Sequence, residues 1–429
     1  MRRTLFSVAL LLCICIAAGA QRKDVRNEVL ADWNLSSGLD CVIDLSVKPA
    51  TPAPKGYKAV YISHYGRHGS RYAYTDKAYK VILDMLSEAQ DKDNLTPRGE
   101  ALLEELVPFW DFVHYRVGDL TTLGWEQHRQ IASIMVKSYP AAFRSGSLVD
   151  ACSSSSPRAI MSMSSCCAAI SRLAPKTEVY EHQSVMDIPA TRPNRNNPFV
   201  YSGPSRPFPY DETMETFFSR HFPEYEDVLA RLFKDPKAAM AGRNPSETFF
   251  YLYMFVGGMN SLPEQERLHL DGFFTREEYA KLWEVMNYAA FKEYYNYLTP
   301  CSSIVDDIVD KADARIASRR PGADLRYGHD HVFMTLLMIM DIDGFGHVPA
   351  SSDSLAYWFQ DFRSPMGANM QFVFYSPKNG KGDYLVKLLL NGEEAALGDL
   401  KAVQGPYYKW EDARAYLRKR VEKFAYRPE

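Results

Sequence analysis

Strand-like and helix-like segments alternate in two parts of this chain, and the part between them has hardly any strand signal. Residues 58–64 and 148–152 are short runs of apolar, β-branched or aromatic residues, and a turn and an amphipathic helix pattern follow each run. Such alternation is typical of an α/β sheet. We therefore predict a three-layer α/β core with a mostly parallel sheet at 57–187 and 322–429, and an inserted all-α cap domain at 188–321.

The composition suits a large globular core and argues against several classes of function. Hydrophobic residues make up 46% of the 429 residues and charged residues 24%, which excludes fibrous and low-complexity chains. The formal net charge of −3 provides no general attraction for nucleic acid or for an anionic membrane surface. An anionic ligand must therefore be held by a local basic site.

The first twenty residues have the layout of a secretory signal peptide. Two arginines precede the apolar stretch 5–18, and Ala18 and Ala20 are the small residues before a cleavage point at Gln21. We therefore expect an exported protein, periplasmic or extracellular after cleavage near Ala20. The loss of two arginines moves the net charge from −3 to −5.

The segment after the signal and the cysteines say less about function. Residues 21–56 carry three prolines near their end and are expected to form an N-terminal arm that leads into the sheet. Five cysteines remain after cleavage, so at least one thiol has no partner within the chain, and the pairing stays open. The longest apolar run beyond the signal, 332–340, is too short to span a bilayer, and we expect no membrane span.

A basic pentapeptide follows the first predicted strand, at the end of the strand where open α/β sheets place ligands. Arg67 and Arg71 flank His68, and their guanidinium groups suit the oxygens of a phosphate ester. Gly69 allows the backbone to approach closely. A neutral imidazole can attack phosphorus and later leave, which suits a phosphohistidine intermediate. The alternative is a solvated turn that is basic by chance.

A second candidate group follows the strand-poor stretch and opens a helix pattern. It contains His329, Asp330 and His331, and a histidine beside a carboxyl group is what a phosphomonoesterase needs opposite its nucleophile. Two alternatives are a metal site on these three residues, although no HExxH-type spacing supports it, and a solvated helix cap. We expect no metal and no organic cofactor.

A third candidate is Arg158, which follows a run of serines at another strand-to-helix turn. Arg158 could complete an anion clamp with Arg67 and Arg71. It could equally be the first-turn arginine of a surface helix. The residues alone leave these two readings open.

Several motifs carry a resemblance to a known family. The chain contains RHGSRY at 67–72, LTTLGWEQH at 120–128, DIPATRPNRN at 187–196, GHD at 328–330 and VKLLLNGEE at 386–394. In this order they resemble the histidine acid phosphatase branch of the histidine phosphatase superfamily, and within it bacterial relatives of multiple inositol polyphosphate phosphatase, which are phytases.

The resemblance implies roles for six of these residues. His68 would be the nucleophile that becomes phosphorylated, and Asp330 would be the proton donor. Arg67, Arg71, Arg158 and His329 would bind the phosphate. The inositol phosphatase group usually ends the second motif as His-Ala-Glu, whereas this chain has His329-Asp330-His331. An acid at the second place is similar to the phytase and glucose-phosphatase branch, and whether His331 contributes in place of the usual glutamate stays open.

Three windows contain basic residues and no acid: 62–75, 151–177 and 188–210. Arg192 and Arg195 in the third window are candidate substrate contacts if that window lines a cleft between the domains. They could instead anchor the connection through ion pairs. His64 and His128 are expected to pack near the sheet rather than act in catalysis.

Together these features predict an exported phosphomonoesterase that hydrolyses inositol polyphosphates such as phytate. It would act through a phosphohistidine intermediate with an aspartic acid as proton donor. The expected partner is a small anionic phosphate ester, and we expect no nucleic-acid partner. The alternatives are a broad acid phosphatase that acts on sugar phosphates and a non-catalytic protein that binds a phosphate ligand.

Overall fold

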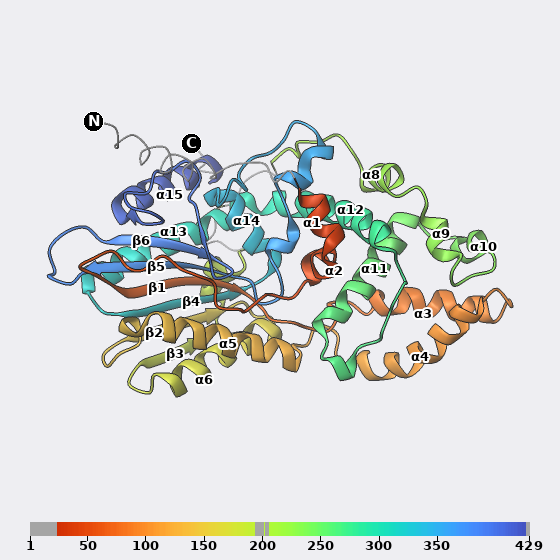
Figure 1. The fold of residues 1–429 in the computed structure, drawn as a ribbon, viewed down its shortest axis with the longest axis horizontal. Coiled ribbons are helices and arrows are strands. Elements are labelled where there is room, and N and C mark those ends of the chain that lie inside the picture. Colours follow the sequence, from red (N-terminus) through yellow and green to blue (C-terminus); the bar gives the residue numbers. More distant parts are fainter. Residues whose placement is uncertain (1–23, 194–200, 202–205, 426–429) are drawn as a thin grey trace, which may run out of the picture.

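The structure is a computed structural model that describes residues 24–193, 201 and 206–425, so the predicted signal peptide lies outside the described residues. Its centre is an eight-stranded sheet with the strand order β3-β2-β4-β1-β5-β6-β7, and β8 pairs with β6 (Figure 1). The strands are β1 (Tyr57–Arg67), β2 (Leu148–Ser153), β3 (Glu178–His182), β4 (Gly322–Gly328), β5 (Asn369–Pro377), β6 (Leu385–Leu390), β7 (Glu393–Ala395) and β8 (Tyr408–Lys409).

The sheet has a parallel half and an antiparallel half. β3, β2, β4 and β1 are parallel to one another, whereas β5 pairs antiparallel with β1. β5, β6 and β7 follow one another in the chain and pair antiparallel, which needs no crossover helix. The predicted α/β class is confirmed, and the sheet is mixed with parallel strands at its core.

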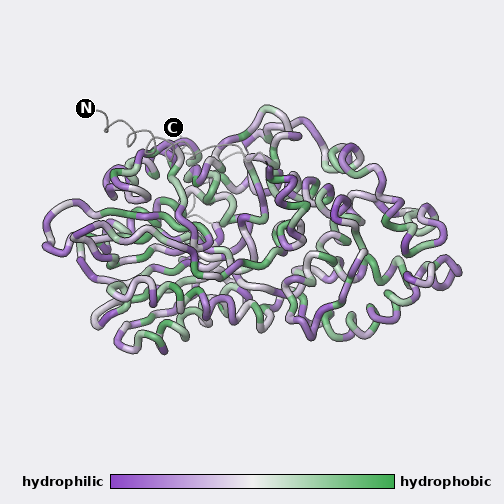
Figure 2. The backbone as a smooth tube through the Cα atoms, in the orientation of Figure 1, coloured by the Kyte–Doolittle hydropathy of each residue, from purple (hydrophilic) through white to green (hydrophobic). Residues whose placement is uncertain are grey.

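Helices cover both faces of this sheet (Figure 1). One face carries α5 (Thr122–Ser138) and α6 (Pro157–Leu173), and the other carries α13 (Leu298–Ser318), α14 (Asp330–Met340) and α15 (Trp410–Phe424). The central strands carry hydrophobic segments, whereas the outermost turns of the molecule are mostly hydrophilic (Figure 2). The three layers of the predicted core are therefore present.

A helical region lies beside the carboxyl ends of the parallel strands (Figure 1). Its helices include α1 (Val25–Ala31), α2 (Trp33–Ser36), α3 (Lys77–Gln90), α4 (Pro97–Val113), α8 (Met214–His221), α9 (Tyr225–Leu229), α10 (Pro236–Met240), α11 (Pro245–Gly258) and α12 (Arg276–Tyr294). Short α7 (Ile188–Thr191) follows β3 in the chain and packs against α13 and β4.

Local chemistry explains where several helices begin. The Thr96 side chain accepts a hydrogen bond from the backbone N–H of Gly99, and Pro97 occupies the first position of α4. Thr121 caps α5 in the same way. In α12, Thr275 and Glu278 form a reciprocal capping box.

The packing departs from the predicted domain limits at two places. α3 and α4 fall within 57–187, yet α3 packs against α11 because its apolar face shares one hydrophobic cluster with that helix. α13 falls within 188–321, yet it packs against α14 and α15 over the sheet. The helical region is thus built from more than one stretch of chain, and the domain limits themselves stay a prediction.

Two strands have no clear pattern in the sequence. β4 is buried along its whole length but carries Asp324 and Arg326, whose charges hide the strand signal. Both charges are paired: Asp324 with Arg315 of α13, and Arg326 with Asp307. β3 is an edge strand with mostly exposed residues, so it lacks the apolar run of a buried strand.

The cysteines in the described residues are free thiols, and all five are buried. Burial raises the pKa of Cys152 to about 12 and that of Cys166 to about 12, so these thiols stay protonated. In the described part of the chain, no helix combines the length and the apolar character that crossing a membrane requires.

Candidate active site

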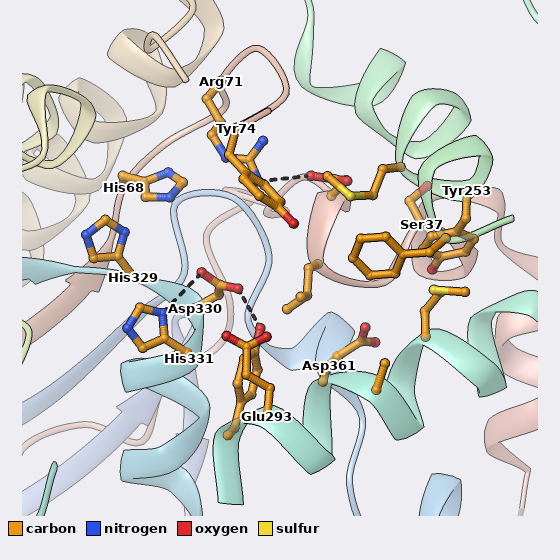
Figure 3. A pocket seen from close by; sticks show the side chains of 18 of the residues that line it. Ser37, His68, Arg71, Tyr74, Tyr253, Glu293, His329, Asp330, His331 and Asp361 are labelled. Atoms are coloured by element: carbon orange, nitrogen blue, oxygen red, sulfur yellow. Dashed lines mark hydrogen bonds and ion pairs between the residues drawn. The ribbon is translucent and has the colours of Figure 1, made fainter. Parts of the chain in front are cut away.

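A cavity of about 250 Å³ lies at the carboxyl ends of β1 and β4, where the sheet meets the helical region (Figure 3). The two strands are parallel neighbours, and Arg67 pairs in register with Gly328, so the segments that follow them lie side by side. The acidic and basic residues that line the cavity are Asp40, His68, Arg71, Arg158, Arg192, Glu293, His329, Asp330, His331 and Asp361.

His68 is a buried imidazole with one ring nitrogen occupied. Its Nδ1 lies 2.9 Å from the carbonyl oxygen of Gly69, so Nδ1 carries the proton and donates while Nε2 keeps its lone pair. Burial holds the pKa of His68 well below its usual value, and the positive charges of Arg158 and Arg67 lower it further. The ring is therefore unprotonated at neutral and mildly acidic pH.

Three arginines near this ring present N–H groups that have no acceptor among the described residues. Arg67 is fully buried; its Nη1 donates to two backbone carbonyl oxygens, but its Nε and Nη2 lack a partner. The Nε atoms of Arg71 and Arg158 are also buried without an acceptor. Buried donors are normally paired, so this group is suited to an anion.

Two of the arginines are held by their surroundings. Nη2 of Arg71 lies 3.6 Å from Oδ1 of Asp40, and its guanidinium lies over the ring of Tyr74. Burial and the nearby Arg71 lower the pKa of Arg158 to about 10, so Arg158 remains charged at neutral pH. Arg158 is the second residue of α6 and points into the cavity rather than to the surface.

The loop that carries His68 crosses α5 at very short range. A Cβ on Gly69 would lie 2.5 Å from the carbonyl oxygen of Gly124, and a Cβ on Gly124 would lie 2.2 Å from that of Ser70. Gln127 anchors the next residue, because its side chain bonds both the backbone N–H and the hydroxyl of Ser70. The two glycines therefore set the position of the His68 loop.

Asp330 is the first residue of α14 and faces the same cavity. Its Oδ2 accepts a hydrogen bond of 2.5 Å from the Tyr294 hydroxyl, and its Oδ1 lies 4.0 Å from Nδ1 of His331. Burial raises the pKa of Asp330. The positive charge of Arg67, followed by the nearby His331 and the hydrogen bond from Tyr294, lowers this pKa by more than burial raises it. Asp330 is thus a carboxylate in the free protein.

His329 occupies the N-cap position of α14, and its side chain makes no capping hydrogen bond there. Its Nε2 lies 2.9 Å from the Ser154 hydroxyl oxygen, its ring meets that of His68 edge-on, and it stacks on the ring of His331. Burial and the neighbouring His331 hold the pKa of His329 well below its usual value. Burial lowers the pKa of His331 to about 4. All three histidines are neutral at pH 7.

The fold can be compared with solved structures. The multiple inositol polyphosphate phosphatase of Bifidobacterium longum, in complex with inositol hexasulfate, matches with a TM-score of 0.70 at 16% identity over 89% of this chain and 97% of that chain. The phytase from D. castellii matches with a TM-score of 0.58 at 14% identity over 92% of this chain and 85% of that chain. This chain has the histidine acid phosphatase fold.

The histidine acid phosphatase fold was expected from the motifs, and the structural match confirms it. No protein-family model matches the sequence, and no relative was found among curated proteins. At these identities the structural match establishes the fold alone. The roles of individual residues rest on the geometry of the site.

Within this histidine acid phosphatase fold, the predicted residues gather at one place. Six of them line the cavity: His68, Arg71, Arg158, Arg192, His329 and Asp330. Arg67 is buried behind the cavity, with an effect on the pKa of both His68 and Asp330. Arg195 lies outside the described residues.

Other candidate residues have different surroundings. His64 and His128 are buried against Tyr327, away from the residues that line the cavity. In the described residues, no group of three or more histidine, cysteine, aspartate or glutamate side chains is arranged to hold a metal ion.

Sequence reasoning missed four residues at the site. Asp40 comes from a single 3-10 turn in the predicted N-terminal arm, Glu293 and Tyr294 from the end of α12, and Asp361 from another 3-10 turn, Asp361–Arg363. None belongs to a motif, and each is distant in sequence from His68. Burial raises the pKa of Asp361 to about 7, although Trp283 donates to it. Burial, and the nearby Asp330, raise the pKa of Glu293.

Proposed function

We propose that this protein is a phosphomonoesterase that acts through a phosphohistidine on His68. The observation that carries the proposal is the free Nε2 of His68 beside three arginines whose buried N–H groups have no acceptor among the described residues. A phosphate ester would satisfy those donors and would present its phosphorus to the ring nitrogen. A solvated basic turn would leave none of these donors buried.

In the first step, the Nε2 lone pair of His68 attacks phosphorus and the bond from phosphorus to the ester oxygen breaks. Arg67, Arg71 and Arg158 stabilise the negative charge on the phosphoryl oxygens. The departing oxygen takes a proton from Asp330, which lies across the cavity on α14. The products are an alcohol and a phosphohistidine.

Asp330 must gain a proton before this step, since it is a carboxylate in the free site. A bound phosphate offsets the positive field of Arg67, which is the largest influence that lowers the pKa of Asp330, and so favours the protonated acid. A substrate that binds as the monoanion brings that proton with it, because the second pKa of a phosphate ester is about 6. In the second step, water attacks phosphorus and Asp330 accepts the proton of that water. The bond from phosphorus to Nε2 of His68 breaks, which releases inorganic phosphate and restores the neutral imidazole.

The test combines two variants with a trapping experiment. His68→Ala should abolish turnover. Asp330→Asn should slow the hydrolysis of alkyl phosphates by about 10²- to 10⁴-fold. It should slow the hydrolysis of aryl phosphates much less, since an aryl oxide leaves without a proton. His269→Ala, which changes an exposed histidine outside the cavity, is the matched control. Rapid quenching should trap an acid-labile phosphoryl group on the wild type and on His269→Ala, and none on His68→Ala.

Full turnover by His68→Ala would refute the mechanism. Tight binding of phosphate without any trapped phosphoryl group or turnover would favour the alternative of a non-catalytic binding protein.

Inositol phosphates are the substrate class that the fold neighbours support, because the Bifidobacterium longum enzyme is in complex with inositol hexasulfate. Arg192 on the rim supports an anionic ester as well. A second candidate, an acid phosphatase for sugar phosphates and similar monoesters, is favoured by the carboxyl groups of Asp40, Glu293 and Asp361 in the same cavity. Phosphate release from phytate, glucose phosphates and an aryl phosphate separates the two.

Export is the remaining part of the proposal. It is supported by the two arginines, the apolar stretch and the small residues before Gln21. Expression of the full chain in a bacterial host, with sequencing of the mature N-terminus, should find Gln21 as the first residue of an extracytoplasmic protein. Retention of residue 1 on a cytoplasmic protein would contradict export.

A further inference from the structure

A second cavity, of about 290 Å³, lies at the end of the sheet away from the candidate active site. Its walls come from the start of β1, the end of α13 and the loop that follows β5. His68 follows the carboxyl end of β1, whereas this cavity lies near the amino ends of β1 and β4, where Tyr61 pairs in register with Gly322. The helical region is at the opposite end of the same strands (Figure 1), and the two cavities share no described lining residue.

Positive charge is concentrated in this second cavity. Among the described lining residues, six are lysine or arginine and none is aspartate or glutamate. Two of the six have acidic partners: Arg315 pairs with Asp324, and Arg320 pairs with Glu178. The side chains of the other four have no hydrogen bond and no ion pair among the described residues, and these four are Lys58, Arg144, Arg319 and Lys378. The cavity thus has an excess of positive charge in a chain whose net charge is −3.

Arg315 gives this cavity a buried cationic group that is already held in place. Its side chain is 10% exposed, and its guanidinium lies over the ring of Tyr61. Nε and Nη2 donate to the carboxylate of Asp324 over 3.3 and 2.5 Å, whereas Nη1 has no acceptor among the described residues. The Tyr61 hydroxyl also donates to Asp324, which fixes that carboxylate. A donor oriented before binding loses little freedom when an anion arrives.

A single phosphate group would balance only part of the charge in this cavity. A phosphate monoester carries a charge of about −1.5 to −2 near neutral pH, whereas four of the lining cations have no partner. Guanidinium groups donate forked hydrogen bonds to phosphate oxygens, and ammonium groups add compact charges. These groups line a cavity close in size to a small-molecule site, rather than a flat face. The charges therefore suit a small polyanion.

We propose that this cavity is a second ligand site, which binds a small molecule with two or more phosphate groups. The guanidinium groups of Arg144 and Arg319 bind phosphate oxygens, and Lys58 and Lys378 balance the remaining charge. The described lining residues include no histidine, cysteine or carboxylic acid, so the ligand is bound here and not hydrolysed. The site is independent of the chemistry proposed for His68.

The experiment counts the tripolyphosphate bound per chain by equilibrium dialysis at low salt. His68→Ala is the background, so that the proposed nucleophile does not consume the probe. In this background, Lys58→Glu with Lys378→Glu should lose one bound tripolyphosphate per chain, because two cations become acids that repel it. Lys80→Glu with Lys237→Glu makes the same charge change at exposed positions of α3 and α10 and should lose none.

Arg319→Asn is a second variant, chosen because it suits the backbone. The φ of Arg319 is 55°, a left-handed conformation that asparagine adopts readily. This variant should weaken the binding of tripolyphosphate at this cavity by about threefold or more, and the loss should be smaller at high salt. Inorganic phosphate should bind the cavity about tenfold more weakly than tripolyphosphate, since it contacts fewer of the cations.

The outcomes decide the proposal whether or not the protein hydrolyses esters. The same number of bound tripolyphosphates in the two lysine variants would overturn it, and so would inorganic phosphate that binds as tightly as tripolyphosphate. Vesicles of phosphatidylglycerol provide the last probe. If the Lys58 and Lys378 variant loses binding to vesicles and no bound tripolyphosphate, the cavity contacts an anionic surface instead, which also overturns the proposal.

Discussion

Gly69 is the residue with the least room at the site. We predict that Gly69→Ala lowers the free energy of unfolding by about 1–3 kcal/mol, because a Cβ 2.5 Å from the carbonyl oxygen of Gly124 forces the backbones apart. The same shift moves His68, so kcat/KM should fall by about tenfold or more. Denaturant unfolding and initial rates on an aryl phosphate measure the two effects.

Gly258→Ala is the matched control at the end of α11. A Cβ there meets nothing within 4 Å, and the backbone is helical. Alanine should therefore leave stability unchanged or raise it by up to about 1 kcal/mol. Equal losses in the two variants would contradict the role of close approach at Gly69.

Single residues could be predicted where the chemistry is contiguous in the chain. Arg67, His68 and Arg71 share one turn, so their residue types and spacing alone indicate a site for an anion. Asp40 and Glu293 could not be predicted, because their neighbours in sequence have no related chemistry. They face the cavity only because distant segments pack there.

Among the elements, β4 depends most on its partners. We predict that Asp324→Leu lowers the free energy of unfolding by about 3–5 kcal/mol, because it leaves Arg315 without its buried partner and removes the acceptor of the Tyr61 hydroxyl. The double variant Asp324→Leu with Arg315→Met should recover more than half of that loss. Chemical unfolding of the two variants tests this coupling.

An exposed ion pair at the edge strand β3 provides the control. Arg320 and Glu178 lie 2.9 Å apart with side chains that are 40% and 55% exposed. Glu178→Ala should therefore cost about 0–1 kcal/mol. A larger loss at Glu178 than at Asp324 would contradict the account of β4.

The elements that could be predicted are those whose burial is visible in the sequence. β1 and β2 are short runs of apolar, β-branched or aromatic residues, and α5 and α6 repeat apolar residues with the helical period. β4 has no such pattern, because it carries two charges whose partners come from α13 and from the adjacent strand β1. Its burial depends on contacts that no local pattern reports.

At the scale of the whole molecule, neutral histidines sealed in the core should make the fold sensitive to acid. Burial lowers the pKa of His64 to about 3 and that of His128 to about 3, and their ring nitrogens have no partner among the described residues. In the unfolded chain a histidine binds a proton near pH 6.5. The unfolded state therefore binds more protons between pH 6.5 and about 3, and the free energy of unfolding falls as pH falls through this window.

Between pH 6 and pH 4, we predict that His128→Gln reduces the slope of the free energy of unfolding against pH by about 1.4 kcal/mol per pH unit, since glutamine does not ionise. The measurement is the free energy of unfolding by denaturant at several pH values. His269→Gln is the control, because this imidazole is exposed in the folded protein and should leave the slope unchanged. Equal slopes for wild type and His128→Gln would contradict the prediction.

The sequence by itself determined the class of the fold and the strand that carries the His68 motif, and its resemblance to a known family supplied the candidate nucleophile and acid. These features can be predicted because a periodic pattern of apolar residues, or a set of adjacent functional groups, lies within one short stretch of the chain. Tertiary structure alone decided that α3 and α4 join the helical region and that Asp40, Glu293 and Asp361 face the arginines across one cavity. Those outcomes depend on which apolar faces meet and which charges find partners between distant segments, and no single segment carries that information.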